Sequence, residues 1–305
     1  MKVLVTGAAG QLGQALVAAR PEGVELLALG RHQLDLADAA ACRAAVVEHR
    51  PDWVINAAAY TAVDKAEGEA ALAEAVNAGA PAALAQALEV SGGSLLQLST
   101  DFVFNGAQGS PYRPEQAVAP LGVYGASKAA GERRVLELLG GAGRGIVLRT
   151  SWAYGPVGRN FCLSLLRLHR DRAAAGAPLG VVADQVGCPT STAGLARACW
   201  RVLSPAAPLP PILHWSDAGA ASWYDFAVAI GELGVAQGLL EQAAAVVPLT
   251  TAEYPTPAQR PSYSLLDCSG TRQLLGLPAQ HWRAALADVL QAIQAGALAR
   301  GPGVS

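Results

Sequence analysis

The sequence predicts an α/β protein with a doubly wound parallel sheet and a smaller C-terminal lobe that is interleaved with it. Two observations support this fold class. Short apolar runs alternate with segments of helical period through the first half of the chain, which is typical of a parallel sheet with helices on both faces. In addition, each glycine-rich or polar motif directly follows an apolar run, where ligands bind in such sheets.

The first strand is expected at Lys2–Thr6, before a glycine turn and a helix over Gln14–Ala19. The turn carries the spacing G-x-x-G-x-x-G, with glycines at positions 7, 10 and 13. Such glycines let the backbone approach a pyrophosphate, which the helix N-terminus then binds. We therefore predict a Rossmann-type dinucleotide site with Gly7, Gly10 and Gly13 in contact with the cofactor, the alternative being a turn without a ligand.

The second strand, Val24–Leu29, ends near the expected adenosine ribose. An acidic residue here favours NAD, whereas an arginine suits the 2′-phosphate of NADP. Gly30 and Arg31 occupy this place, so NADPH is the predicted cofactor, with NADH as the alternative. Asp35 is a candidate for the adenine edge or, equally, for the cap of a helix over Ala37–His49.

The remaining strands of the sheet are predicted at Trp53–Asn56, Leu95–Ser99 and Gly145–Arg149. Helices are expected between and after them at Ala70–Ser91, Ser127–Leu139, Phe161–Arg172, Ala193–Leu203 and Trp223–Ile230. We assign residues 1–155 to a dinucleotide-binding domain, to which later segments return. Residues 156–300 are assigned mainly to a substrate-binding lobe. The small residues Ala58 and Ala59 after the third strand would let the backbone approach the cofactor.

Tyr124 and Lys128 are four residues apart, so both side chains lie on one face of a helix. The pKa of a tyrosine is about 10, and an adjacent cation lowers it toward neutrality. Such a pair suits proton transfer to a carbonyl oxygen. Thr100, at the end of a strand, could hydrogen-bond the same oxygen.

Composition limits the possible classes of function. The net charge of the 305 residues is −2, which gives no support for binding nucleic acid or an anionic membrane. No apolar run is long enough to span a bilayer. The five cysteines are scattered and lack C-x-x-C spacing, which predicts reduced thiols in a cytoplasm and no structural zinc.

Longer motifs identify a more specific resemblance, and they extend from Met1 to about Trp282. They are the glycine turn at 7–13, the runs 56–67, 99–104, 120–128 and 149–152, Asp184–Thr190 and Tyr254–Pro261. Together they resemble the dTDP-4-dehydrorhamnose reductase family of the extended short-chain dehydrogenase/reductase superfamily. The run Val63-Asp64-Lys65-Ala66-Glu67 and the run Asp184-Gln185-Val186-Gly187-Cys188-Pro189-Thr190 are far more specific than Tyr-x-x-x-Lys.

The resemblance implies a role for each matching residue. Thr100, Tyr124 and Lys128 match catalytic positions, and Thr100, Asp101 and Trp152 match substrate contacts. The positions that match cofactor contacts are Gln11, Leu12, Asp35, Leu36, Ala59, Tyr60, Thr61, Tyr124 and Lys128. From its charge, Arg260 could bind the diphosphate of a sugar nucleotide or form a salt bridge at the rim.

Three departures from the family pattern affect these expectations. Gly30 stands where some relatives carry an acidic ribose ligand, which strengthens the prediction of NADPH. Phe102 replaces the more usual tyrosine after Thr-Asp, so that hydroxyl is absent. Gln14 stands where some members place a glutamate that helps to bind Mg²⁺ at a dimer contact. A homodimer is therefore possible, but one that depends on Mg²⁺ is not expected, and we assign no metal ligand.

The resemblance implies NADPH-dependent reduction of the C4 keto group of a dTDP-sugar. Two alternatives remain at this stage. One is another sugar-nucleotide reductase, an epimerase or a dehydratase of the same fold, although a dehydratase would need a second carboxylate where Phe102 stands. The other is a non-catalytic NADP-binding regulatory subunit, against which the intact Thr100, Tyr124 and Lys128 argue.

Overall fold

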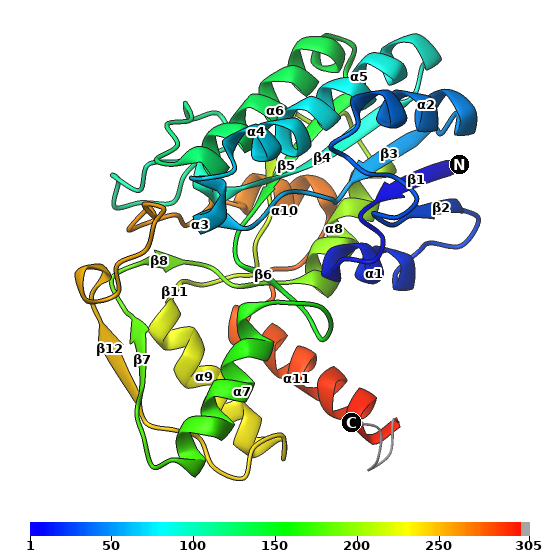
Figure 1. Ribbon diagram of the computed structural model, residues 1–305. Helices are drawn as coiled ribbons and strands as arrows, with labels where there is room; N and C mark the ends of the chain where they lie inside the picture. The colour runs from blue at the N-terminus through cyan, green and yellow to red at the C-terminus, as the bar shows by residue number, and fades with distance from the viewer. Residues whose placement is uncertain (300–305) are drawn as a thin grey trace.

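A parallel six-stranded sheet forms the centre of the larger lobe in the computed structural model, which describes residues 1–299 (Figure 1). In spatial order the strands are β10 (Ile212–His214), β5 (Gly145–Thr150), β4 (Ser94–Thr100), β3 (Trp53–Asn56), β1 (Lys2–Thr6) and β2 (Glu25–Leu29). The five predicted strands are confirmed to within one residue at each end. β10 was not predicted, because it is only three residues long and follows a proline-rich stretch.

Helices cover both faces of the sheet, as the doubly wound prediction requires. One face carries α2 (Ala39–His49), α5 (Ala80–Ser91) and α6 (Val123–Leu139), and the other carries α1 (Gln11–Ala18) and α8 (Thr192–Leu203). Leu4 packs in the first layer, whereas its neighbours Val3 and Val5 pack in the second. Alternate side chains of β1 are therefore buried on opposite faces, which explains why this strand is apolar throughout.

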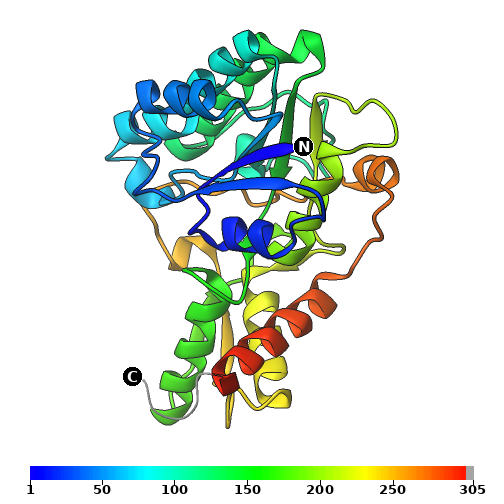
Figure 2. The same cartoon turned by 90° about the vertical axis from the view of Figure 1, so that its right-hand side faces the viewer.

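The second lobe extends away from the sheet (Figure 2). It contains α7 (Phe161–Ala174), α9 (Trp223–Ala236) and α11 (Trp282–Ala299), with a core around Phe226, Ile230 and Leu286. Three short strand pairs complete it: β6 (Ala153–Tyr154) with β9 (Thr190–Ser191), β7 (Leu179–Val182) with β12 (Val246–Leu249), and β8 (Val186–Gly187) with β11 (Ala221–Ser222). The shorter helical segments of the chain are α3 (Val63–Ala66), α4 (Ala70–Glu74), α10 (Ser269–Leu275) and the turns η1 (Ala75–Gly79), η2 (Asp101–Val103), η3 (Gly140–Ala142) and η4 (Thr251–Glu253).

Several helix boundaries differ from the prediction. α2 begins at Ala39, and its cap is Asp38, whose carboxylate accepts hydrogen bonds from two backbone N–H groups. Asp35 is therefore not the cap. The segment predicted as one helix over Ala70–Ser91 is interrupted by a π-helical turn, η1. α6 begins four residues earlier than predicted and includes Tyr124 in its first turn.

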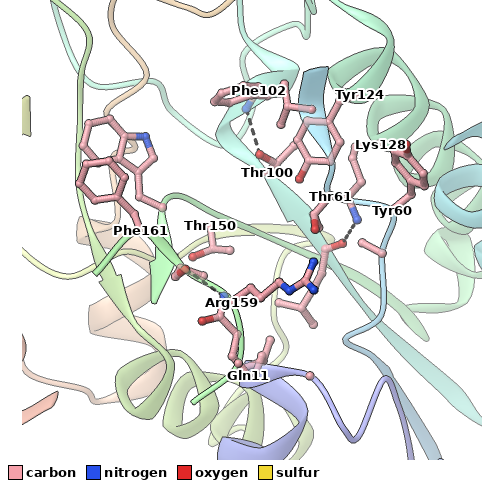
Figure 3. Close-up of a pocket in the computed structure, with 18 of the residues that line it drawn as sticks. Gln11, Tyr60, Thr61, Thr100, Phe102, Tyr124, Lys128, Thr150, Arg159 and Phe161 are labelled. Carbon is pink, nitrogen blue, oxygen red and sulfur yellow. Dashed lines mark hydrogen bonds between the residues drawn. The ribbon is translucent and has the colours of Figure 1, made fainter. Parts of the chain in front are cut away.

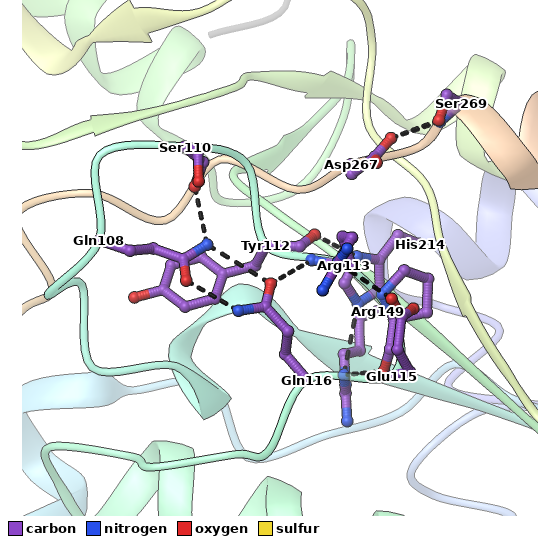
Figure 4. A network of polar contacts seen from close by, with 11 residues as sticks. Gln108, Ser110, Tyr112, Arg113, Glu115, Gln116, Arg149, His214, Asp267 and Ser269 are labelled. Atoms are coloured by element: carbon purple, nitrogen blue, oxygen red, sulfur yellow. Dashed lines mark hydrogen bonds and ion pairs between the residues drawn. The ribbon is translucent and has the colours of Figure 1, made fainter.

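A buried polar network fixes the long loop that precedes α6 (Figure 4). The Arg149 guanidinium forms an ion pair with Glu132 of α6 at 2.7 Å and donates a hydrogen bond to the Pro114 carbonyl oxygen at 3.1 Å. His214 bonds to the Tyr112 carbonyl oxygen at 3.0 Å. Burial and the adjacent Arg149 lower the pKa of His214 to about 3, so its ring is neutral and Arg149 is the cation of this network.

The close contact between α6 and η1 predicts the effect of one substitution. Gly131 of α6 faces the Asn77 carbonyl oxygen, which a methyl group at this position would overlap. We expect Gly131→Ala to destabilise the fold by about 1–3 kcal/mol, as overpacking does. The free energy of unfolding in urea measures this change. Gly141→Ala, which adds its methyl group to open space in η3, is the matched control, and an equal loss in both variants would contradict the prediction.

Candidate active site

A cavity of about 1080 Å³ lies between the carboxyl ends of the sheet strands and the second lobe. Its wall includes residues after β1, β2, β3 and β4, together with residues of α6, α7 and β7. Every site residue predicted from the sequence lines this cavity except Gly13. The structure therefore brings together side chains that are more than 200 positions apart in the chain.

The glycine turn allows two close backbone contacts at the first strand. Gly7 has φ +66°, and a Cβ there would lie 2.8 Å from the Cβ of Ala58 after β3. Gly13 lies beneath the turn, where any side chain would overlap the backbone of Gly7 and Ala8. No side chain caps the N-terminus of α1, so its N–H groups are available to a phosphate. The turn therefore fits the pyrophosphate of a dinucleotide.

The far end of the cavity carries Arg31, Asp35 and Leu36, which follow β2. Arg31 is exposed. The Asp35 carboxylate accepts a hydrogen bond from the backbone N–H of Ala37 at 3.0 Å. This end offers a positive charge to an adenosine ribose.

The π-helical turn η1 directs Asn77 toward the segment after β3. The Asn77 side chain accepts a hydrogen bond from the Tyr60 N–H at 2.9 Å and donates one to the Tyr60 carbonyl oxygen at 3.0 Å. It also donates to the Ser127 hydroxyl of α6 at 3.0 Å. Asn77 thus fixes Tyr60 relative to α6, a role that sequence analysis missed although a lone asparagine in an alanine-rich helix was a signal.

Thr100, Tyr124 and Lys128 lie together on one wall of the cavity (Figure 3). Lys128 is 4% exposed, and its ammonium donates a hydrogen bond to the Leu98 carbonyl oxygen at 2.6 Å. The ring of Phe102 meets that of Tyr124 edge to face, with the centroids 5.8 Å apart. The three residues come from the end of β4 and from the first two turns of α6.

The pKa of Tyr124 differs from the sequence expectation. Although the side chain is only partly shielded from solvent, desolvation by the surrounding protein raises the pKa of Tyr124 to about 12, against a lowering effect of the Thr100 hydroxyl. Lys128 is not a cause of this shift, and burial lowers the pKa of Lys128 itself to about 8. At neutral pH the phenol is thus protonated and can donate a proton.

Asp101 supports Thr100 in the cavity wall. One carboxylate oxygen accepts a hydrogen bond from the Thr100 hydroxyl at 3.0 Å, and the other accepts one from Ser264 at 2.5 Å. Burial raises the pKa of Asp101 to about 6, against the lowering effect of these hydroxyls. Because the Thr100 proton points to this carboxylate, the hydroxyl must rotate before it can donate to a substrate.

Trp152, which follows β5, also lines the cavity and has a left-handed backbone conformation with φ 47°. Its indole stacks on that of Trp223, with the centroids 3.5 Å apart and the planes inclined by 7°. One face of the Trp152 ring is therefore already covered. Sequence analysis did not assign Trp223, since its position at the start of a predicted helix gave no indication of this stack.

Arg260 forms an ion pair with Asp64 at 2.8 Å, next to the cavity. This contact is the salt bridge that the sequence left open, and it lowers the pKa of Asp64, largely through the hydrogen bond from Arg260. Asp64 belongs to the Val63–Glu67 run, whose Glu67 carboxylate accepts a hydrogen bond from the first N–H of α6, that of Val123, at 2.9 Å. The run thus connects α6 to the segment that carries Arg260.

Among residues 1–299, no group of three or more His, Cys, Asp and Glu side chains is placed to hold a metal ion. None of the helices in this range is long and apolar enough to cross a membrane. All five cysteines are buried and free of disulfides.

The fold and the Thr100, Tyr124 and Lys128 cluster define a protein of the extended short-chain dehydrogenase/reductase class. A family model described as "RmlD substrate binding domain" matches residues 1–295. A dTDP-4-dehydrorhamnose reductase from Streptomyces griseus is 44% identical, with 98% of this chain and 97% of that protein covered. The chain belongs to the dTDP-4-dehydrorhamnose reductase family.

Solved structures agree with this assignment. A dTDP-4-dehydrorhamnose reductase from Clostridium acetobutylicum superposes with a TM-score of 0.86 at 35% identity, covering 96% of this chain and all of that one. One from Bacillus anthracis in complex with NADP gives a TM-score of 0.85 at 34% identity, with 94% and 98% of the two chains covered. The predicted fold class and family are confirmed.

Removal of the Tyr124 hydroxyl tests the proposed proton donor. Tyr124→Phe keeps the ring and its contact with Phe102, so we expect cofactor affinity to change little. Turnover should fall by about 10² or more, the range for loss of a general acid. Steady-state kinetics and cofactor titration of the same preparation measure the two effects, and near-normal turnover would remove Tyr124 from the mechanism.

Proposed function

We propose that this protein reduces the C4 keto group of dTDP-4-dehydro-L-rhamnose to give dTDP-L-rhamnose, with NADPH as the reductant. This reaction is the last step of dTDP-rhamnose biosynthesis. The observation that carries the proposal is the position of Thr100, Tyr124 and Lys128 in a cavity shared by the glycine turn and the second lobe. Family membership over nearly the whole chain supports the same reaction.

The residues that would hold the cofactor follow the edge of the sheet. Arg31, Asp35 and Leu36 lie at the adenosine end, and the glycine turn with Gln11 and Leu12 lies at the middle. Ala58, Ala59, Tyr60 and Thr61 continue this wall toward Tyr124 and Lys128. When bound, NADPH supplies the hydride that reduces the carbonyl carbon.

The proposed work of the protein is to handle the proton and the developing charge. Tyr124 donates its phenolic proton to the C4 oxygen. Because the pKa of Tyr124 is about 12, the phenol still carries this proton at neutral pH. The buried Lys128 ammonium, which is bonded to the Leu98 carbonyl oxygen and does not lower the pKa of Tyr124, would instead reach the nicotinamide ribose. Thr100 positions the carbonyl oxygen once its hydroxyl turns from Asp101.

The substrate would occupy the second-lobe side of the cavity, as the prediction of a substrate lobe over residues 156–300 requires. Trp152 offers an indole ring for the deoxysugar. Arg260 could reach a diphosphate only by giving up part of its contact with Asp64. The buried free cysteines support a reducing compartment such as the cytoplasm, and a homodimer remains a prediction from the sequence.

The decisive assay measures NADPH oxidation by the purified protein with dTDP-4-dehydrorhamnose. We expect substrate-dependent oxidation and a dTDP-L-rhamnose product. Oxidation with simple ketones but not with this sugar would defeat the assignment and spare the fold. NADP binding without any turnover would instead indicate a non-catalytic regulatory protein.

The choice of cofactor depends on Arg31 in this proposal. Because its guanidinium would contact the 2′-phosphate, which NADH lacks, Arg31→Ala should raise the KM for NADPH more than the KM for NADH. Initial rates with the two cofactors at saturating sugar measure the difference. Equal changes would mean that Arg31 is an ordinary surface charge.

Trp152 should affect the sugar and not the cofactor. We expect Trp152→Ala to lower kcat/KM for dTDP-4-dehydrorhamnose by about tenfold or more, within the range for loss of a buried aromatic contact, while the Kd for NADPH stays unchanged. Leu274→Ala, on an exposed position of α10, controls for loss of a side chain distant from the cavity. A parallel loss of NADPH affinity in Trp152→Ala would contradict the assigned role.

A further inference from the structure

The loop of residues 155–160, between β6 and α7, is fixed over the N-terminus of α1. The Gln11 side chain donates a hydrogen bond to the Ala153 carbonyl oxygen at 3.0 Å and accepts one from the Asn160 amide at 3.2 Å. The Asn160 amide also donates to the carbonyl oxygens of Gly155 and Val157, within the same loop. Gln11 is the first residue of α1 and lies within the glycine turn at residues 7–13, so the second lobe is bonded to the turn itself.

Arg159 is the cation of this loop, and its side chain reaches into the cavity above Gln11 (Figure 3). It is exposed and forms no ion pair within the described part of the chain. The other cations of the cavity wall are placed differently. Arg260 is paired with Asp64, Lys128 is bonded to the Leu98 carbonyl oxygen, and Arg31 lies beyond the end of β2.

The order of the strands locates Arg159 along the cavity. Arg31 follows β2, the glycine turn follows β1, and Tyr124 lies beside β4, with β1 between β2 and β4 in the sheet. A dinucleotide that extends from Arg31 to Tyr124 therefore places its pyrophosphate near Gln11. The turn at residues 7–13 contains no charged side chain, so only N–H groups and the helix dipole would face the two phosphate charges there.

We propose that Arg159 binds a diphosphate group in the cavity, and that this group is the pyrophosphate of the dinucleotide. A planar guanidinium suits phosphate oxygens because it can donate two parallel hydrogen bonds. Bound in this way, the pyrophosphate lies between the glycine turn and a loop of the second lobe. The inference rests on dinucleotide binding, as proposed above, and assigns a residue of the second lobe to it.

Equilibrium binding to the full-length protein tests this role without any need for turnover. The variant is Arg159→Gln, and the matched control is Arg167→Gln, which removes an exposed arginine of α7 that does not line the cavity. The ligands are NADPH, NADH and dTDP, each titrated at low and at moderate salt. NADPH and NADH share a pyrophosphate, whereas dTDP carries the diphosphate of the sugar nucleotide.

We expect Arg159→Gln to raise the Kd of NADPH and NADH by the same factor, about ten- to a hundredfold, as for a lost hydrogen bond to a charged group. The Kd of dTDP should change by less than about twofold, and Arg167→Gln should leave all three unchanged. A raised Kd of dTDP with unchanged Kd values of the two dinucleotides would assign Arg159 to the diphosphate of the sugar nucleotide. It would overturn the pyrophosphate assignment. A change in the Kd of NADPH alone, or no change in the Kd of any of the three ligands, would overturn the proposal.

The bond between Gln11 and Asn160 provides a second test. If this contact holds Arg159 in place, Gln11→Ala should weaken the binding of NADPH. Adding Arg159→Gln to that variant should then reduce NADPH affinity by a smaller factor than it does in the wild-type protein. Additive effects of the two substitutions would show that the loop does not depend on Gln11. Wild-type protein that binds NADPH but does not reduce the sugar would refute the proposed reaction and leave this inference intact.

Discussion

The buried ammonium of Lys128 is the interaction on which the arrangement of the site depends. A charge in a low-dielectric interior is costly unless it is hydrogen-bonded, and the Leu98 carbonyl oxygen at the end of β4 supplies that bond at 2.6 Å. The contact requires α6 to lie close against β4. Glycines also bring α6 close to η2 and η1, since a side chain at Gly125 would overlap the Phe102 carbonyl oxygen and one at Gly131 would overlap that of Asn77.

A buried ion pair fixes the middle of the same helix. Glu132 lies one turn beyond Lys128, is 4% exposed and pairs with Arg149 of β5. Removing one partner of such a pair typically costs about 3–5 kcal/mol, so the helix has little freedom to rotate. Arg149 also bonds to Pro114 in the loop before Tyr124. Residues outside the cavity therefore help to determine where Tyr124 lies.

The two lobes meet through polar contacts that frame the cavity. The ion pair between Asp64 and Arg260 joins the segment after β3 to the second lobe. The hydrogen bonds of the Gln11 side chain join the glycine turn to β6 and to the loop before α7. Both contacts join segments that line the cavity. Binding of the cofactor on the sheet side and binding of the sugar on the second-lobe side would thus both act on these few hydrogen bonds.

The sequence by itself determined the sheet, the glycine turn, the positions of Tyr124 and Lys128 on one helix, and the family, because these depend on local patterns and short motifs. Only the tertiary structure decided which groups those residues meet. Burial raised the pKa of Tyr124, Asp101 bonded to the Thr100 hydroxyl, Trp223 covered one face of Trp152, and Asp64 paired with Arg260. A π-helical turn placed Asn77 against Tyr60, and a loop between the lobes placed Arg159 in the cavity wall. These contacts join residues far apart in the chain, and desolvation depends on the whole surrounding fold, so no local pattern could predict them.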